Sequence, residues 1–187
     1  MCGRLNVIDE PLSQIVSETL GIEFTTSSNN NLCPSQKVAA VAKENGCFQV
    51  NATWGIKPNW SKNVLINAQS ETVHQKATFE NAFLNHRCVV PCSGWYEWRL
   101  EGGRKVKYLF EHSENQPLFM GGILYNPQSP QLVTLTVKPN EKCSQYHHRM
   151  PLLIEPENLD YWFHSTPDEL MPLMRGVKDD LVNVFKC

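Results

Sequence analysis

The stretch "RCVVPCSGWYEWRLEGGRKVKYLFEH", residues 87–112, decides the fold. Its short runs of valine, aliphatic and aromatic residues are bounded by proline, serine or glycine, a pattern typical of consecutive β-strands. Similar runs occur at 37–43, 47–55, 63–68, 117–125 and 131–137. Because regular alternation of strands and helices is absent, we predict an α+β fold in one domain, residues 1–187, with a curved, barrel-like antiparallel sheet and flanking helices.

Helical patterns interrupt these strands. A helix is expected over 9–20, with Asp9 as its N-cap, Pro11 in its first turn and Gly21 as its stop. Further helices are expected at 74–85, 156–164 and 167–175. The polar stretch 25–31 is predicted to be a loop, and the only flexible segment.

Composition and charge are those of an ordinary soluble domain. The 187 residues carry 17 Lys+Arg against 19 Asp+Glu, so that binding to phosphate must come from a local patch. Seven cysteines without a repeated CxxC pair, and no leader or membrane-spanning run, predict a reduced, cytoplasmic monomer without membrane, metal or cofactor. Cys88 and Cys92 share one face of a strand, which favours buried structural thiols over metal ligands.

The amino terminus carries the most specific chemistry. Removal of Met1 would leave Cys2 with a free α-amine and a thiol on adjacent carbons. An α-amine has a pKa near 8, so it can attack an aldehyde at neutral pH, and the thiol can then close on the imine carbon to give a thiazolidine. The thiolate can alternatively attack an acyl group. A cysteine at this position by chance is the alternative interpretation.

Two polar residues stand in apolar surroundings. Asn67 follows a strand-like apolar run, and its amide either serves a site or satisfies a neighbouring turn. Glu97 lies between Tyr96 and Trp98. Desolvation by aromatic residues raises a carboxyl pKa into the range of general acid–base catalysis, whereas simple alternation on a half-exposed strand is the alternative.

A histidine pair precedes an arginine near the carboxyl-terminal helices. His147 or His148 can move a proton, and Arg149 can hold a phosphate or carboxylate, although surface histidines in a loop explain the pair equally well. Because adjacent residues of a strand point to opposite faces, at most one histidine is expected in a shared site.

The tryptophans offer stacking surfaces for unpaired bases as an alternative to core packing. Trp54, Trp60 and Trp98 are the candidates, interleaved with Arg4 and other cations.

Together these segments resemble one family. The motifs "MCGRL", "NLCPSQ", "TWGIKPNW", "INAQSET", "RCVVPCSGWYEW", "PLFMGGIL" and "HHRMPLLI" are similar in order and spacing to those of the SOS response-associated peptidase family, from residue 2 to about residue 162. The resemblance implies that Cys2 captures the ring-opened aldehyde of an abasic site in single-stranded DNA as a thiazolidine crosslink. Weak lyase activity and autopeptidase exposure of Cys2 are also implied.

The resemblance also assigns site residues. It implies Cys2 as nucleophile, with Asn67, Glu97 and His147 as catalytic partners. The implied DNA contacts are Gly3, Arg4, Pro34, Trp60, Gln69, Ser70, Trp98, Thr136 and Arg149. Gln69 stands where relatives usually carry arginine, and Glu80 where they usually carry a basic residue, so weaker non-specific binding to DNA than in relatives is expected.

Two rival functions use the same residues. A thiol peptidase would attack a peptide carbonyl with Cys2, using His147 as its base. A non-covalent single-stranded DNA-binding protein would use the tryptophans and Arg4 and would not need Cys2.

Overall fold

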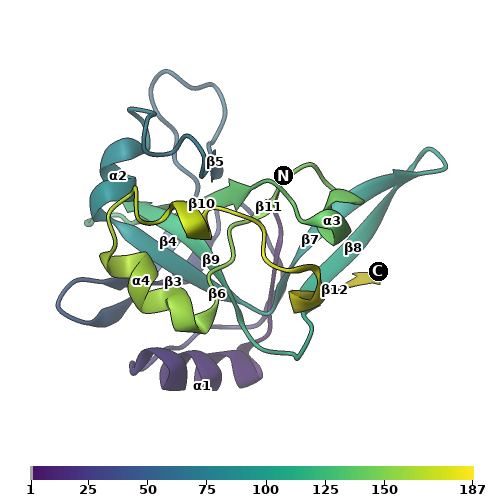
Figure 1. Ribbon diagram of the computed structural model, residues 1–187, viewed down its shortest axis with the longest axis horizontal. Coiled ribbons are helices and arrows are strands. Elements are labelled where there is room, and N and C mark those ends of the chain that lie inside the picture. Colours follow the sequence, from purple (N-terminus) through teal and green to yellow (C-terminus); the bar gives the residue numbers. More distant parts are fainter. Residues whose placement is uncertain (1) are drawn as a thin grey trace.

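Two β-sheets form the framework of the computed structural model, which describes residues 2–187; the predicted removal of Met1 lies outside the described residues (Figure 1). The first sheet has the strand order β12-β8-β7-β1-β2. Its members are β1 (Leu5–Val7), β2 (Asn29–Leu32), β7 (Gly94–Glu101), β8 (Arg104–His112) and β12 (Val182–Lys186). All pairings in this sheet are antiparallel.

The second sheet has the order β11-β10-β4-β3-β6-β9, with β5 beside β10. Its members are β3 (Lys37–Lys43), β4 (Cys47–Trp54), β5 (Asn67–Gln69), β6 (Arg87–Cys92), β9 (Leu118–Tyr125), β10 (Gln131–Val137) and β11 (Met150–Pro151). It curls so far that β10 also pairs with β9. The predicted α+β class with a curved sheet is confirmed, although two sheets with edge strands take the place of a closed barrel.

One feature of the second sheet differs from the prediction. Strand β10 runs parallel to β4 and to β5, whereas the sheet was expected to be antiparallel. The parallel register sets Asn67 opposite Thr134 and Gln69 opposite Thr136. This pairing places Asn67, at the polar end of the run 63–68, directly beside strand β10.

The core lies between the two sheets and is rich in aromatic residues. Trp54, Trp95 and Trp162 are fully buried, and the Trp95 ring stacks on Phe110 with 4.8 Å between ring centroids. Burying a large apolar side chain contributes roughly 1.5–3 kcal/mol. For Trp54 the structure therefore supports core packing and excludes a stacking platform for DNA.

The helices pack mainly against the second sheet, most often on its inner strand β6. They are α1 (Asp9–Leu20), α2 (Glu80–Asn85), α3 (Glu141–Ser144) and α4 (Leu159–His164), with 3-10 turns at Pro156–Asn158, Met171–Leu173 and Asp179–Leu181. The predicted helices at 9–20 and 156–164 are confirmed, and Gly21 ends the first with a φ of 65°. Asp9 does not cap α1 as predicted, because the next residue, Glu10, has extended backbone angles (φ −99°, ψ 128°) and the Asp9 carboxylate accepts from the Ser13 hydroxyl instead.

Two helix predictions are wrong in extent. Over 74–85 only α2 is helical, because the preceding residues form turns in which the Thr72 carbonyl accepts from the backbone of Gln75 and Lys76. Residues 167–175 form turns and a short 3-10 segment. Pro172 lies inside that predicted helix, where it lacks the N–H that an α-helix needs.

Strand predictions fail where pairing overrides local preference. The predicted loop 25–31 ends in β2, because β1 supplies a partner that sets Leu5 opposite Leu32. In the run 63–68 the ladder starts only at Asn67, while Leu65 forms an isolated bridge with Ile56. Strands β1, β11 and β12 were not predicted as such.

The predicted thiol pair in "RCVVPC" is buried. Cys88 and Cys92 are both free thiols with no exposed surface, and burial raises the pKa of Cys92 to about 12. These thiols are therefore inert core residues. Among residues 2–187 no helix combines the length and the apolar character needed to cross a membrane.

Candidate functional site

Asn67 holds the second residue of the chain in place. Its Nδ2 donates to the carbonyl oxygen of Cys2 at 2.9 Å, and its Oδ1 accepts from the Thr134 hydroxyl. The preceding residue is fixed as well, because Trp54 Nε1 donates to the Ile66 carbonyl at 3.2 Å. The amide of Asn67 thus serves the amino terminus and the neighbouring strand, and not a local turn.

Glu97 is buried within β7. Only 4% of its surface is exposed, so the alternative of a half-exposed strand position does not hold. Burial raises the pKa of the Glu97 carboxyl from 4.5 to about 7. A carboxyl with this pKa can give and take a proton at neutral pH.

Cys2 and Glu97 lie within electrostatic reach of each other. The Cys2 side chain is buried, and its thiol pKa is raised first by burial and then by the negative charge of Glu97. The backbone of Arg4 donates toward the sulfur, which acts in the opposite direction. The thiol is therefore protonated at neutral pH.

His147 is half-buried and held by the backbone beside it. His147 Nδ1 lies 3.0 Å from the backbone nitrogen of Arg149 and 3.1 Å from its carbonyl oxygen, so the Arg149 backbone can hold the ring in either tautomer. Burial lowers the pKa of His147, so the ring is neutral at neutral pH. The His148 ring packs against it, with 4.3 Å between centroids, and is itself exposed.

Arg149 is fixed by an acidic partner that sequence analysis missed. Its guanidinium makes two parallel hydrogen bonds to the Glu71 carboxylate, at 2.8 and 2.7 Å, and a third to the Thr136 carbonyl at 2.6 Å. Burial alone would raise the Glu71 pKa, but the bonds from Arg149 outweigh it and the pKa is lowered. The pair is ionised at neutral pH and orients the guanidinium.

A cleft of about 550 Å³ brings several predicted DNA contacts together. Its lining includes Trp60, Asn67, Gln69, Thr136 and Arg149. Trp60 has 69% of its surface exposed at the rim. The cleft also contains His148 and Lys76, neither of which was predicted to bind DNA.

Thr136 and Ser70 support this cleft from beneath. They are 2% and 1% exposed. The Thr136 carbonyl accepts from the Ser70 backbone at 2.9 Å as well as from Arg149, so Thr136 acts as a positioning residue for both.

A second group of predicted contacts lies on the first sheet. The Arg4 guanidinium carbon lies 5.8 Å from the centroid of the Trp98 ring, and Arg4 Nη1 donates to Asn31 Oδ1 and to Cys33 Sγ. Pro34, next along the chain, is partly exposed. Cys2, held by Asn67 and followed by Gly3 and Arg4, joins this group to the cleft.

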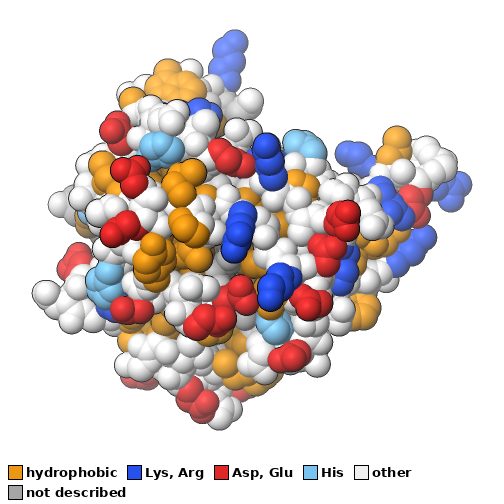
Figure 2. All heavy atoms as spheres, in the orientation of Figure 1, with side chains coloured by type: hydrophobic (Ala, Val, Ile, Leu, Met, Phe, Trp, Pro, Cys, Tyr) orange, Lys and Arg blue, Asp and Glu red, His pale blue; other side chains and the backbone are white. Residues whose placement is uncertain are grey.

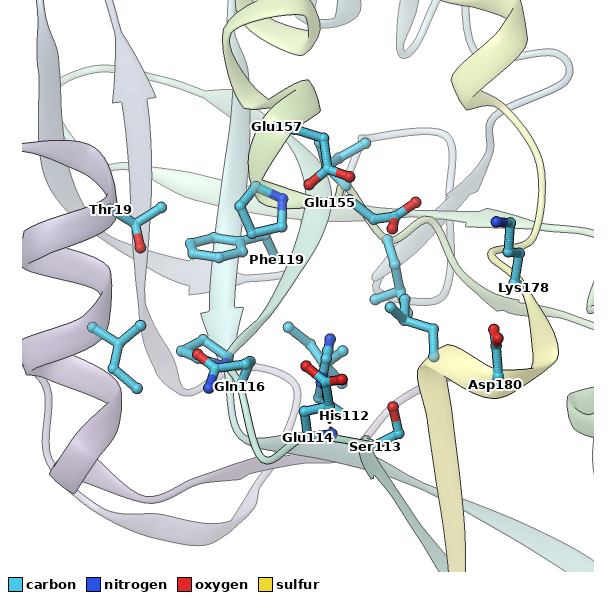
Figure 3. A pocket seen from close by; sticks show the side chains of 17 residues that line it. Thr19, His112, Ser113, Glu114, Gln116, Phe119, Glu155, Glu157, Lys178 and Asp180 are labelled. Atoms are coloured by element: carbon cyan, nitrogen blue, oxygen red, sulfur yellow. Dashed lines mark hydrogen bonds between the residues drawn. The ribbon is translucent and has the colours of Figure 1, made fainter.

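Another pocket lies away from these residues. It has a volume of about 520 Å³ and is lined by Glu114, Glu155, Glu157 and Asp180, with His112 and Lys178 beside them (Figure 3). This acidic lining repels phosphate. Over the body of the molecule, the face shown in Figure 2 mixes cations and anions.

Sequence reasoning missed the partners of the predicted residues. Glu71 stands in the "NAQSET" motif but is 78 residues from Arg149, and only the folded β10 brings them together. Cys33 meets Arg4 across 29 residues. No local pattern predicts such long-range pairs.

The fold and this site define a protein with a cysteine-bearing amino terminus held beside a cleft of mixed apolar and polar lining. The model of the SOS response-associated peptidase family matches residues 1–186. The chain belongs to that family.

Two relatives of this chain are named abasic site processing proteins. The chain is 25% identical to the abasic site processing protein YoqW of Bacillus subtilis, over 100% of this chain and 92% of that protein. It is 27% identical to the abasic site processing protein YedK of Escherichia coli, over 72% of this chain and 64% of the relative. A crystal structure of a Bordetella bronchiseptica protein has a TM-score of 0.86 at 17% identity, covering 100% and 99% of the two chains.

Proposed function

We propose that this protein captures abasic sites in single-stranded DNA by forming a thiazolidine crosslink through Cys2 once Met1 is removed. Its relatives YoqW and YedK are named abasic site processing proteins. The observation that carries the proposal is the hydrogen bond from Asn67 to the Cys2 carbonyl, because it fixes the reactive residue beside the cleft. Holding two reacting groups in the correct position and orientation accounts for a large part of the rate acceleration of their reaction.

The proposed reaction needs no oxidant or cofactor. The Cys2 amine attacks C1′ of the open sugar and forms a carbinolamine, which loses water to give an imine. The thiol then adds to the imine carbon, forming the S–C1′ bond, while its proton goes to the nitrogen. The product is a five-membered ring, and the sugar carbonyl oxygen has left as water.

Glu97 and His147 are proposed to move the protons of these steps. Glu97 accepts a proton from the attacking amine and returns one to the carbinolamine hydroxyl, a role supported by its pKa of about 7. His147 is proposed to pass a proton to the aldehyde oxygen as that oxygen becomes the carbinolamine hydroxyl, and to regain a proton from water. Asn67 fixes the backbone of Cys2 so that amine and thiol reach the same carbon.

The exposed tryptophans support a single-stranded substrate. Trp60 and Trp98 have 69% and 37% of their surfaces exposed. Stacking on such rings requires unpaired bases and does not depend on sequence. Arg4 and Arg149 are proposed to bind phosphates, which makes affinity fall with salt.

The thiol peptidase is less well supported by this geometry. A peptidase needs the Cys2 thiolate as its first nucleophile, but burial and Glu97 raise the thiol pKa. Capture begins with the amine instead, and the thiol reacts later as a neutral group. We therefore favour capture over peptide cleavage.

The test is a gel assay on the mature protein. Intact mass first establishes that Met1 is absent. The protein is then incubated with a single-stranded oligonucleotide that contains one abasic site, and a denaturing gel is expected to show a shifted covalent band. Cys2→Ala is expected to lose the band, whereas Cys187→Ala, which removes an exposed thiol at the other end of the chain, is expected to keep it.

Cys2→Ser separates the two bonds of the adduct. It retains the amine, so a covalent band is expected when borohydride is added to reduce the imine. Without borohydride no band is expected, because the thiol that closes the ring is missing. A band that persists in Cys2→Ala refutes the proposal. Cleavage of peptides by the wild type without any DNA adduct would establish the peptidase instead.

A further inference from the structure

The β7–β8 hairpin extends from the body of the protein as a two-stranded arm, residues 98–107 (Figure 1). Beyond this point its neighbours end, since β1 pairs with β7 only at Trp95 and Gly94, β12 pairs with β8 as far as Tyr108, and one further backbone bond runs from Cys187 to the Lys107 carbonyl. An isolated two-stranded ribbon is marginally stable in water. Since this arm does not pack into the core, we expect it to function in binding.

The arm is cationic in a chain with a net charge of −2. It carries Arg99, Arg104, Lys105 and Lys107 against a single acid, Glu101. On the projection at the upper right of Figure 2, blue side chains outnumber red ones, and orange side chains lie among them. Such a local charge attracts a polyanion.

The charges are divided between the two faces of the arm. On one face Arg99 and Tyr108 both bond to Glu101, and Lys186 reaches the same carboxylate. This network leaves Glu101 neutralised. Among the described residues no salt bridge involves Arg104, Lys105 or Lys107.

The opposite face combines apolar and cationic side chains. The register sets Trp98 opposite Lys107 and Leu100 opposite Lys105, so these four residues share one face. Leu100 has 71% of its surface exposed and Trp98 has 37%. Exposed apolar groups interleaved with unpaired cations match the bases and phosphates of a single strand.

This face continues directly into the proposed capture site. Arg4 lies over the Trp98 ring at 5.8 Å, and the Tyr96 backbone donates to the Arg4 carbonyl. Lys107 Nζ lies 3.7 Å from the Tyr96 ring centroid, which holds that cation on the same face. A strand that passes Arg4 and Trp98 therefore meets Lys107, Leu100 and Lys105 next.

We propose that this arm binds the single-stranded DNA that flanks the captured nucleotide, with Lys105 and Lys107 on phosphates and Trp98 and Leu100 against bases or sugars. The inference rests on the proposed function for the direction in which the strand leaves Cys2. The arm would extend the DNA-binding surface beyond the site at which the abasic nucleotide is captured.

The test measures binding to DNA without a lesion, so that it does not depend on crosslinking. Labelled single-stranded oligonucleotides of about 5 and about 20 nucleotides, a range that spans known site sizes, are titrated at several salt concentrations. The double variant Lys105→Gln/Lys107→Gln removes both charges and keeps side-chain length. Lys178→Gln, at the rim of the acidic pocket of Figure 3, is the control for loss of one lysine.

The double variant is expected to bind the longer oligonucleotide about tenfold more weakly at low salt, with a slope of log K against log salt that is lower by about 1.4. Binding of the short oligonucleotide and the yield of crosslink at saturating DNA are expected to be unchanged. Failure of the wild type to crosslink would refute the proposed function while leaving this comparison intact.

Three results would overturn the inference. One is a salt slope of the double variant equal to that of Lys178→Gln. Another is absence of lesion-free binding by the wild type. The third is self-association of the variant with unchanged DNA binding, which would mean that the lysines protect a free sheet edge.

Discussion

Replacing Glu97 by Gln tests how burial tunes the proposed proton carrier. In the folded protein the Glu97 carboxyl has a pKa of about 7 in place of 4.5, because burial disfavours the carboxylate. The folded chain therefore holds this proton more tightly than the unfolded chain does. Stability from this effect is fully present below about pH 4.5, falls as pH rises, and is lost above about pH 7.

The magnitude follows from the two pKa values. Their difference corresponds to about 3 kcal/mol of unfolding free energy, lost between about pH 4.5 and about pH 7. Glutamine has nearly the same shape and does not ionise. At pH 8 we expect Glu97→Gln to be more stable than the wild type by about 3 kcal/mol, and at pH 4.5 we expect equal stability.

Activity is expected to move in the opposite direction. The variant lacks a group that accepts the amine proton, so crosslinking should slow by a factor of about 10² to 10⁴. In the wild type the rate should rise with pH through about 7, as the Glu97 carboxylate forms, and this inflection should be missing from the variant.

Urea denaturation followed by tryptophan fluorescence, between pH 4.5 and pH 8.5, measures the stability. The denaturing gel measures the rate over the same range. A stability difference that is the same at both ends of the range would show that Glu97 is not held protonated by burial. Unchanged crosslinking in a folded Glu97→Gln variant would remove Glu97 from the mechanism.

Three further predictions concern other contacts of the fold and the site. Asn67→Ala is expected to slow crosslinking by about 10²-fold, because the Cys2 backbone loses its anchor, while DNA affinity in a gel-free titration stays near the wild-type value; an unchanged rate would contradict this. Arg149→Met leaves the Glu71 carboxylate without its partner and is expected to weaken binding of lesion-free DNA by about tenfold. The double variant Glu71→Gln/Arg149→Met is expected to recover part of this affinity. No recovery would mean that the Glu71 carboxylate does not repel the DNA phosphates. Arg87→Met removes donors to the carbonyls of Phe83, Trp162, Phe163 and Ser165 and is expected to lower the unfolding free energy by about 3 kcal/mol or more in urea titrations; a loss below about 1 kcal/mol would show that water satisfies those carbonyls.

The sequence predicted those parts of the fold in which local pattern and tertiary packing agree. The runs that became β3, β6 and β10 are rich in β-branched residues and are buried on both faces. The asparagines of β2 have low strand propensity, and only pairing with β1 makes them extended. The helix predicted over 167–175 begins with Pro167, a favourable first-turn residue, but Pro172 stands too far inside the segment for an α-helix to continue through it.

The site was predictable to the extent that its residues stand in short motifs. The neighbours of Asn67 and Glu97 left a structural role open for both, and the family resemblance assigned them to the site with Cys2. The fold brings Cys2 and Asn67 into direct contact. The bond between Arg149 and Glu71 depends on the parallel register of β5 and β10, which periodicity does not specify. The buried positions of Thr136 and Ser70 depend on the same register.

The position of β1 inside its sheet has a consequence for how a DNA adduct could be cleared. β1 lies between β7 and β2, whereas β12 is an outer strand, so an unfolding machine that pulls from the carboxyl-terminal end meets β12 first and reaches β1 only after every later strand. The amino-terminal segment, which carries the crosslinked DNA at Cys2, would be the last to be unfolded. Degradation would then leave DNA tagged with a short peptide stub, and repair would have to finish on that remnant.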